Sequence, residues 1–299
     1  MKIVNIVGGL GNQMFQFAFA IALKERFPEE EIVIDTSHFH YIFFKKYKAA
    51  NMHNGFEVEK VFPKARIKHA RWWQLIRVTW YCPNFLLSRV VKKVFPHRNS
   101  EYAQPVNDYF KYEPNVYSLK GNKYYDGQWS SINYYLPIRD RLIEVFAHPQ
   151  ASGVNMEYIL KMEQTESVGV HIRRGDYLQD PDFRNICELD YYKRAINRIE
   201  EETKDYTFFI FSNDIQWCKK NISPLLSKYK VHFVTENHGS DSCWDMHLMT
   251  HCKNLIIANS SFSWWGAFLN NRGGIIIAPE KWVNRDSVFD IWDANWIRL

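Results

Sequence analysis

The sequence has little of what marks several large classes of protein. No apolar run reaches the about 18 residues that a transmembrane helix needs. Only 13 of the 299 residues are glycine and 11 are proline, and no stretch is of low complexity, which excludes collagen-like and disordered chains. The five cysteines lack a paired spacing, which favours a reducing compartment over a disulfide scaffold. The start of the chain does not resemble a signal peptide, so we expect a cytoplasmic protein.

A strong excess of charge is also absent. The formal net charge is +5, which by itself does not indicate a nucleic-acid partner, and we expect none. Basic residues are nevertheless gathered between Arg66 and Arg98, where eight Lys or Arg occur without an acidic residue. Aromatic residues reach 16% of the chain, and such rings stack on sugars or lie at interfaces. Several of them lie in the basic stretch, including Trp72, Trp73, Trp80, Tyr81 and Phe85.

Two regions of the chain show clear secondary-structure patterns. The first 35 residues predict a strand, a glycine turn, a helix from Gln13 to Phe27 and a second strand. From about residue 165, apolar strands alternate with helices, which predicts right-handed βαβ units and a parallel sheet. The strands are expected at 167–172, 207–212, 230–234, 255–259 and 274–278, and the helices at 190–202, 215–220, 242–252 and 262–271. The fold class is therefore α/β, with a boundary between the two regions that we place after residue 155.

The first motif is the glycine turn Gly8-Gly9-Leu10-Gly11-Asn12-Gln13 between strand and helix. The N–H groups of such a turn and of the helix N-terminus can bind a phosphate. The turn resembles part of the dinucleotide-binding fingerprint, with Asp35 where a ribose-binding acid would stand, but Met14 occupies the third glycine position. A tight turn that only lets helix and strand pack closely explains it equally well.

Three further motifs each follow an expected strand. His171-Ile172-Arg173-Arg174-Gly175-Asp176-Tyr177 ends a strand in two arginines, which bind phosphate oxygens bidentately. Phe211-Ser212-Asn213-Asp214 offers a carboxylate to a guanine edge, and Asn259-Ser260-Ser261-Phe262 begins a helix on hydroxyls and amides. Ligands of open α/β sheets bind beyond the carboxyl ends of the strands, so these motifs predict one nucleotide-diphosphate pocket in the C-terminal domain.

Each of these motifs also has a purely structural explanation. The arginines would then belong to a solvated loop with a surface pair to Asp176. Asp214 would cap the helix that begins at Ile215, and Ser260 or Ser261 would cap the helix that follows them. Capping and phosphate binding are compatible at the serines.

Metal-binding and common nucleophile motifs are weak or missing. Asp180-Pro181-Asp182 is formally an Asp-x-Asp pair, but it lies in a loop several residues past its strand, and we expect no metal there. His247 and His251 have helical spacing without a glutamate base or a third ligand, so a packed helix face explains them better. No Walker sequence and no Gly-x-Ser-x-Gly occurs.

Taken together, the motifs resemble those of the α-1,2-fucosyltransferases of glycosyltransferase family 11. The resemblance rests on residues 8–16, 171–177 and 259–267, in the family's order. It implies a GT-B-like fold, with two Rossmann-like domains and a cleft between them: 1–155 for the acceptor and 156–299 for the donor. It also implies inverting transfer of L-fucose from GDP-β-L-fucose to the 2-hydroxyl of a terminal β-galactoside, with no cofactor and no required metal.

The resemblance implies roles for single residues in donor binding. Arg173 or Arg174 would hold the pyrophosphate, and His171 and Asp214 would lie near guanosine. The remaining donor contacts would be Ser260, Ser261, Phe262, Gly9 and Gly11.

On the acceptor side, Asn12 would face the fucose and the acceptor hydroxyl, with Gln13 and Trp129 as further contacts. Inverting transfer usually needs a carboxylate within reach of that hydroxyl. Asp176 is the first candidate, because it shares a loop with the arginines, although it could instead pair with an arginine and fix it. Without a strong base, Arg173 and its neighbour would carry most of the catalysis by stabilising the departing GDP.

Bacterial transferases of this kind often build lipid-linked glycans at the inner face of the membrane. The resemblance therefore suggests peripheral membrane contact through residues 66–98, and an acceptor-domain surface with snorkelling side chains is the alternative. Two other functions stay open. An NAD-dependent oxidoreductase would use the glycine turn but leaves the paired arginines unexplained, and a non-catalytic glycan-binding protein would use the aromatic residues.

Overall fold

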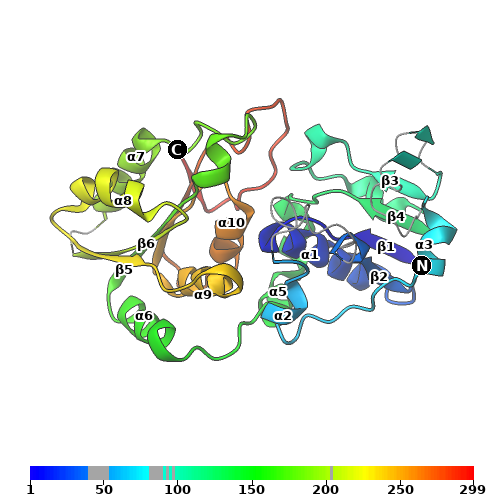
Figure 1. Ribbon diagram of the computed structural model, residues 1–299, viewed down its shortest axis with the longest axis horizontal. Coiled ribbons are helices and arrows are strands. Elements are labelled where there is room, and N and C mark those ends of the chain that lie inside the picture. Colours follow the sequence, from blue (N-terminus) through cyan, green and yellow to red (C-terminus); the bar gives the residue numbers. More distant parts are fainter. Residues whose placement is uncertain (40–53, 81–89, 92–93, 96–97, 203–204) are drawn as a thin grey trace. The chain divides into compact units, whose positions relative to one another are not determined.

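The chain forms two units in the computed structural model, which describes residues 1–39, 54–80, 90–91, 94–95, 98–202 and 205–299 (Figure 1). Unit 1 comprises Met1–Ala147 and Ser287–Ile291, and unit 2 comprises His148–Asp286 and Trp292–Leu299. The structure thus places the boundary somewhat before the expected one at residue 155. It also returns a late segment to unit 1, because the Asp290 backbone bonds to Ile132 N–H (2.7 Å) and to the Phe110 carbonyl (2.9 Å).

Unit 1 is built on a four-stranded parallel sheet of order β2-β1-β4-β3. Its strands are β1 (Lys2–Asn5), β2 (Ile32–Asp35), β3 (Glu101–Ala103) and β4 (Lys123–Asp126). Its helices are α1 (Leu10–Arg26), α2 (Val58–Val61), α3 (Trp72–Val78) and α5 (Arg139–Val145). The predicted strand–turn–helix–strand start is confirmed.

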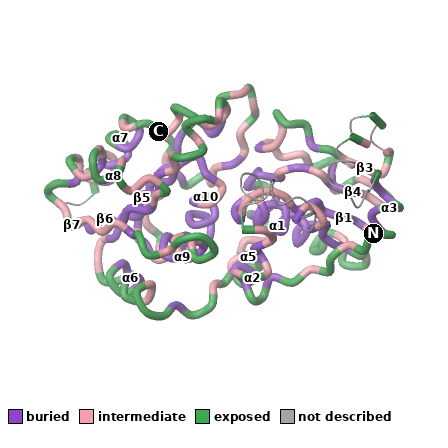
Figure 2. The backbone as a smooth tube through the Cα atoms, in the orientation of Figure 1, coloured by how far each residue is buried: buried purple, intermediate pink, exposed green. Residues whose placement is uncertain are grey.

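The long helix α1 lies in the interior of unit 1. Nearly all of its residues from Leu10 to Leu23 are buried, which Figure 2 shows as purple tube, and it ends just before Pro28. Phe19 on α1 stacks on Trp129 with ring centroids 4.1 Å apart, and Tyr125 and Tyr134 meet the same ring edge-on. The helix is therefore covered on more than one side, and its buried residues include Gln13 and Gln16 beside the apolar ones.

Unit 2 is built on a six-stranded parallel sheet of order β10-β9-β8-β5-β6-β7. Its strands are β5 (Glu166–Ile172), β6 (Tyr206–Ser212), β7 (Lys230–Val234), β8 (Asn254–Ile256), β9 (Ile276–Ala278) and β10 (Ile297–Arg298). Its helices are α6 (Gly153–Glu163), α7 (Leu189–Glu200), α8 (Ile215–Asn221), α9 (Cys243–His251) and α10 (Ser261–Phe268). The five strands and four helices predicted for this region are confirmed, with shifted ends.

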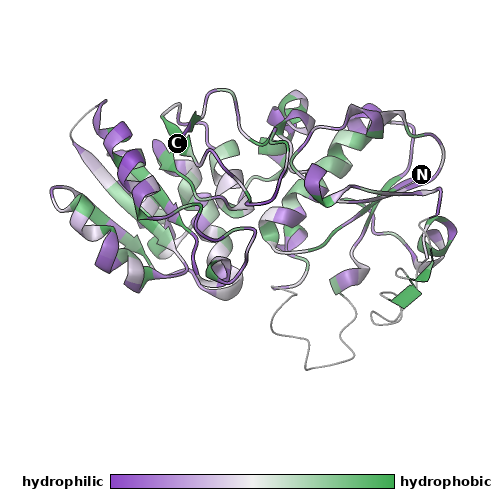
Figure 3. Cartoon of the chain, turned by 90° about the horizontal axis from the view of Figure 1, so that it is seen from above, coloured by the Kyte–Doolittle hydropathy of each residue, from purple (hydrophilic) through white to green (hydrophobic). Residues whose placement is uncertain are grey.

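The register of unit 2 sets the edge from which the site is built. β5 pairs with β6 from Glu166 opposite Tyr206 to Ile172 opposite Ser212, so both strands end at the same level. Val168, Val170, Phe208 and Ile210 are fully buried beneath the helices, whose exposed sides are hydrophilic (Figure 3). Among the described residues, no helix is both long and apolar enough to cross a bilayer.

Candidate active site

The loop after β5 carries the two arginines, and each is oriented by its neighbours. The Arg173 guanidinium forms an ion pair with the Asp176 carboxylate at 2.8 Å. The Arg174 guanidinium lies 4.0 Å above the Trp217 ring of α8, with its Nε 3.5 Å from the Asp214 carboxylate. The two arginines are therefore held in place by a carboxylate and an aromatic face.

These side chains still have unused hydrogen-bonding groups. In the part of the chain that the structure describes, the buried Nε of Arg173 and Nδ1 of His171 lack a hydrogen-bond partner, and the Arg174 Nε has only its 3.5 Å ion pair with Asp214. Burial, together with the positive charge of Arg173, lowers the pKa of His171 to about 3, so its imidazole is neutral. Unsatisfied cationic donors beside a neutral imidazole fit an anionic ligand that brings its own acceptors.

The start of α10 offers a second set of donors. Ser260 is the N-cap residue, but its side chain makes no capping hydrogen bond in the described structure and instead meets the Tyr177 hydroxyl. Asn259 fixes the preceding turn through a 3.1 Å bond from its amide to the Trp282 carbonyl. Ser260 therefore does not cap α10, and its hydroxyl does not accept from the N–H groups at the positive end of this helix. Phe262 in the first turn places its ring 5.9 Å from the His171 ring.

Asp214 has the structural role that was its alternative explanation. One carboxylate oxygen accepts the Trp217 N–H at 3.0 Å and caps α8, and the other faces Arg174. Both oxygens thus already have partners, and its predicted contact with guanosine stays a prediction.

A different carboxylate, Asp245, was missed in the sequence. It lies in the first turn of α9, and burial raises its pKa to about 7. Its Oδ1 accepts one hydrogen bond from Asn237 at 2.8 Å, and Asn237 follows β7 at the same edge of the sheet as the arginines. Nothing in the sequence separates this acid from an ordinary first-turn aspartate, because only burial makes it unusual.

In unit 1 the glycine turn is fixed by its own helix. Gly8 has φ of +82°, and a Cβ atom there would lie 3.1 Å from the Asn12 amide, so glycine is required. Asn12 is half-buried at the start of α1 and remains a candidate for substrate contact, beside Gly9, the N-cap residue, and the buried Gly11.

The structure corrects the predicted role of Gln13. Its side chain is fully buried, and its amide donates to the carbonyls of Gly8 and Gly55, each at 2.8 Å. The amide oxygen accepts the Glu57 N–H, also at 2.8 Å. The side chain therefore ties the glycine turn to residues 55–57 and has no group left for an acceptor sugar.

Replacing Gln13 by alanine leaves two part-buried carbonyls and one buried N–H without this partner. We expect Gln13→Ala to lower the free energy of unfolding by about 3 kcal/mol, as measured by urea titration. Gln13→Glu keeps the acceptor for Glu57 but loses the donors, so it should also destabilise. A loss below about 0.5 kcal/mol in Gln13→Ala would contradict this structural role.

Trp129 is corrected for the same reason. Its side chain is fully buried, stacked on Phe19 and near Tyr102. Its φ of +57° is a left-handed conformation that a bulky residue rarely adopts, and the Gln104 amide oxygen accepts its N–H at 3.1 Å. Trp129 is therefore a core residue that fixes the loop after β4, and it presents no ring face to a sugar.

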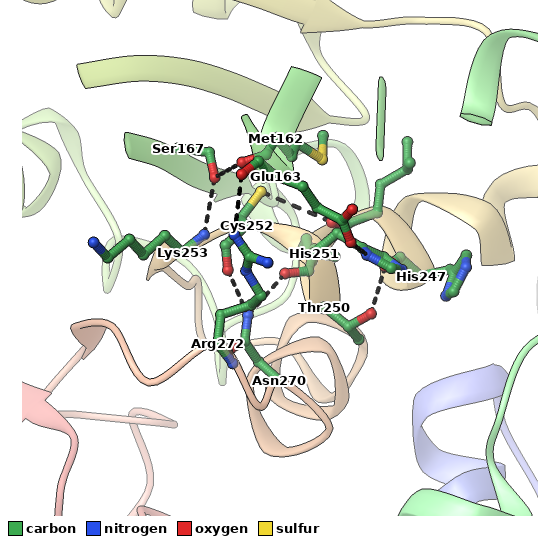
Figure 4. A network of polar contacts seen from close by, with 12 residues as sticks. Met162, Glu163, Ser167, His247, Thr250, His251, Cys252, Lys253, Asn270 and Arg272 are labelled. Atoms are coloured by element: carbon green, nitrogen blue, oxygen red, sulfur yellow. Dashed lines mark hydrogen bonds and ion pairs between the residues drawn. The ribbon is translucent and has the colours of Figure 1, made fainter. Parts of the chain in front are cut away.

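The two weak metal motifs have structural partners. Asp182 pairs with Arg285 at 2.8 Å, and Asp180 accepts the Asp182 N–H in a tight turn. His251 bonds to Glu163 at 2.8 Å (Figure 4), and the His247 ring stacks on His148. Within the described residues, no group of three or more His, Cys, Asp or Glu is arranged to hold a metal ion.

The two parallel-sheet units define a GT-B-like transferase fold. Two solved structures share it at a TM-score of 0.50: the α-1,6-fucosyltransferase NodZ soaked with GDP-fucose and a mutant of Arabidopsis thaliana FUT1 in complex with GDP. They are 15% and 12% identical to this chain, covering 90% and 95% of it and 91% and 72% of their own lengths. At this identity the likeness shows the fold alone.

The sequence model of glycosyl transferase family 11 matches residues 81–299, and the chain belongs to this family. An alpha-1,2-colitosyltransferase of Escherichia coli is 32% identical to it, across 99% of this chain and 98% of the relative. The O-antigen biosynthesis glycosyltransferase WbnK of Escherichia coli is 28% identical across 98% of both. Human galactoside alpha-(1,2)-fucosyltransferase 1 is 31% identical, but over only 41% of this chain and 33% of the human protein. The predicted family is confirmed.

Proposed function

We propose that this enzyme transfers L-fucose from GDP-β-L-fucose to the 2-hydroxyl of a terminal β-galactoside, with inversion and without a metal. The observation that carries the proposal is the group of Arg173, Arg174 and the start of α10 at one sheet edge, in a member of family 11. The names of the relatives support an α-1,2 linkage to a glycan. We assign donor binding to unit 2 and acceptor binding, with Asn12, to unit 1.

The chemistry follows from the charges at this edge. GDP leaves as an anion, and the two guanidinium groups and the α10 amides stabilise its developing charge. His171 is neutral and can donate one hydrogen bond without adding charge. Asp176 pairs with Arg173, so we assign it to positioning that arginine. The bond from fucose to GDP then breaks ahead of the bond that forms to the acceptor oxygen, and the acceptor proton passes late to water or to the departing diphosphate.

Turnover of GDP-fucose with lactose as the acceptor tests this reaction. Fucosylated lactose with GDP as the second product is the expected result. GDP release without fucosylated lactose would support GDP-fucose as the donor and show that lactose is not the acceptor. No GDP release with any β-galactoside, from a folded protein, would overturn the proposal. Because one relative is a colitosyltransferase, a colitosyl donor is the second candidate. Competition between the two donors in one reaction would decide which of them the enzyme prefers.

Independence from metal has its own test. We expect turnover with EDTA to stay within about twofold of turnover without it, because cationic side chains do the work that Mg²⁺ does elsewhere. Asp180→Asn should be equally silent, since its carboxylate holds a turn. Activity abolished by EDTA and restored by Mg²⁺ or Mn²⁺ would contradict this proposal.

For the guanine base, Asp245 and Asp214 are competing carboxylates, and we favour Asp245. A buried acid with a raised pKa is stabilised as the anion when a ligand brings two N–H donors, as the guanine edge does, whereas Asp214 already has two partners. Asp245→Asn should raise the KM for GDP-fucose about 30-fold and erase the preference for GDP over IDP as an inhibitor. Asp214→Asn is the matched control and should keep that preference, and the reverse pattern would assign guanine to Asp214.

The acceptor and its location follow from the same relatives. WbnK is named for O-antigen biosynthesis, which supports an oligosaccharide acceptor, and we propose that this acceptor is lipid-linked. The enzyme would then work in the bacterial cytoplasm at the inner face of the inner membrane. In reactions that contain a lipid-linked acceptor, we expect the fucosylated product to be extracted into the lipid phase.

A further inference from the structure

One side of α3 is apolar and faces outward. Leu75 and Val78 are buried in a cluster with Ile3, Val33 and Tyr124 of the unit 1 sheet. The opposite side of the helix exposes Trp72, Trp73 and Ile76, at 65%, 46% and 48% of their surface. A helix that is anchored by one apolar side and leaves two tryptophans on the other has an unusual surface, since exposed apolar patches mark interaction sites.

A second exposed group continues this surface. Trp80, just after the helix, contacts the Phe95 ring at 5.4 Å, and both are at least 38% exposed. The Arg98 guanidinium lies 4.9 Å above the Trp80 ring and donates to the Ile76 carbonyl at 2.8 Å. Arg98 therefore joins the two groups into one surface, which we call the α3 face: Arg71, Trp72, Trp73, Ile76, Arg77, Trp80, Phe95 and Arg98.

The charge of the α3 face is positive. Arg71 and Arg77 are exposed at the two ends of the helix, and Arg98 adds a third cation. Glu101 is an acid at this surface, because its carboxylate accepts the Trp80 N–H at 3.0 Å. Exposed tryptophans beside arginines fit a lipid headgroup region, where the rings lie at the interface and the cations meet anionic lipid.

We propose that the α3 face docks on an anionic lipid bilayer. A second copy of this chain fits poorly, because a two-fold contact would bring the three arginines of each copy together. A neutral glycan would use the rings but not the charges. The inference does not depend on which sugar the enzyme transfers, so it can fail while the proposed transferase activity stands.

Vesicle flotation tests the proposal on the full-length protein. Wild type should float with vesicles of phosphatidylglycerol and phosphatidylcholine, and not with phosphatidylcholine alone. Binding should be lost at about 1 M salt, where the Debye length is about 3 Å. Trp72→Ser with Trp73→Ser, and separately Arg71→Glu with Arg77→Glu, should each weaken binding, by about fivefold for each basic side chain removed in the second case.

Matched variants separate this face from general effects of charge and hydrophobicity. Lys24→Glu with Lys193→Glu makes the same change in net charge at exposed sites elsewhere, and Val154→Ser with Leu160→Ser removes exposed apolar residues from α6. Both pairs should bind like wild type, and all variants should keep turnover of soluble lactose. Wild type left in solution, or controls that lose binding equally, would overturn the proposal. Wild-type dimers that the tryptophan variant dissociates would assign the face to a second copy instead.

Discussion

Arg174→Ala should lower kcat/KM for GDP-fucose by about 10³-fold, mostly through kcat. The guanidinium is fixed by the Trp217 ring, 4.0 Å away, and by an ion pair of its Nε with Asp214 at 3.5 Å. A cation that is already in place costs no reorganisation when charge develops on departing GDP, so its effect is larger in the transition state than in substrate binding. Single-turnover kinetics on the variant measures that split.

The conservative variant and a matched control make the result specific. Arg174→Lys keeps the charge but loses the planar fork and the stacking on Trp217, so it should recover only part of the activity. Arg194→Ala removes an equal charge from the exposed side of α7 and should leave kcat/KM within about twofold. If Arg174→Ala remained folded and kept a third of the wild-type kcat, the arginine would not be part of the catalytic machinery.

The sheet of unit 2 could be predicted because its signals are local. Each of its central strands is a short apolar run followed by a polar turn, and the carboxyl ends of parallel strands must share an edge. This rule alone predicted that the loops after β5 and β6 lie side by side. The structure confirms it, because the Arg174 N–H donates to the Asn213 side chain at 2.9 Å.

The roles of several side chains could not be predicted because they depend on burial and on distant contacts. Gln13 looked like a ligand residue beside a glycine turn, yet its partners come from Gly55 and Glu57, far along the chain. Trp129 is a core residue because Phe19 lies beneath it. The return of Ser287–Ile291 to unit 1 has no local pattern at all, since it rests on the backbone and carboxylate of Asp290.

Part of the basic stretch that suggested membrane contact lies outside the described residues, including Tyr81 and Phe85. Its described part shows what the sequence could not. Leu75 and Val78 turn inward and Trp72, Trp73 and Ile76 turn outward, so the tryptophans do not belong to the core. Composition predicted the kind of surface, and the helix phase decides which residues form it.

The free energy of unfolding should fall steeply as the pH is lowered from 6.5 towards 4. Burial is the main cause that lowers the pKa of His148 to about 3 and that of His247 to about 4. Burial also lowers the pKa of His171 to about 3. In the unfolded chain these groups take up protons near pH 6.5, so the unfolded state gains protons first as the pH falls. Each histidine then contributes a loss approaching about 1.4 kcal/mol per pH unit.

Asp245 acts in the opposite direction over the same range. Its folded pKa of about 7 lies above the value of 3.8 for an ordinary aspartate, so the folded state binds the extra proton between them. The stability that protonated Asp245 contributes is fully present below pH 3.8 and is lost as the pH rises through about 7. Lowering the pH therefore stabilises the protein at this site and offsets the loss from about one histidine, so the histidine slope is best isolated by mutation.

Urea titrations at several pH values between 7 and 4.5 would measure this slope. His148→Gln with His247→Gln removes two of the three groups without touching the proposed site, and the rings involved stack on each other at 4.5 Å. The variant should lose stability with falling pH more slowly than wild type, by up to about 3 kcal/mol per pH unit. His238→Gln, at an exposed position, should keep the wild-type slope. Parallel curves for the double variant and wild type would show that these histidines take up protons as readily in the folded chain as in the unfolded one.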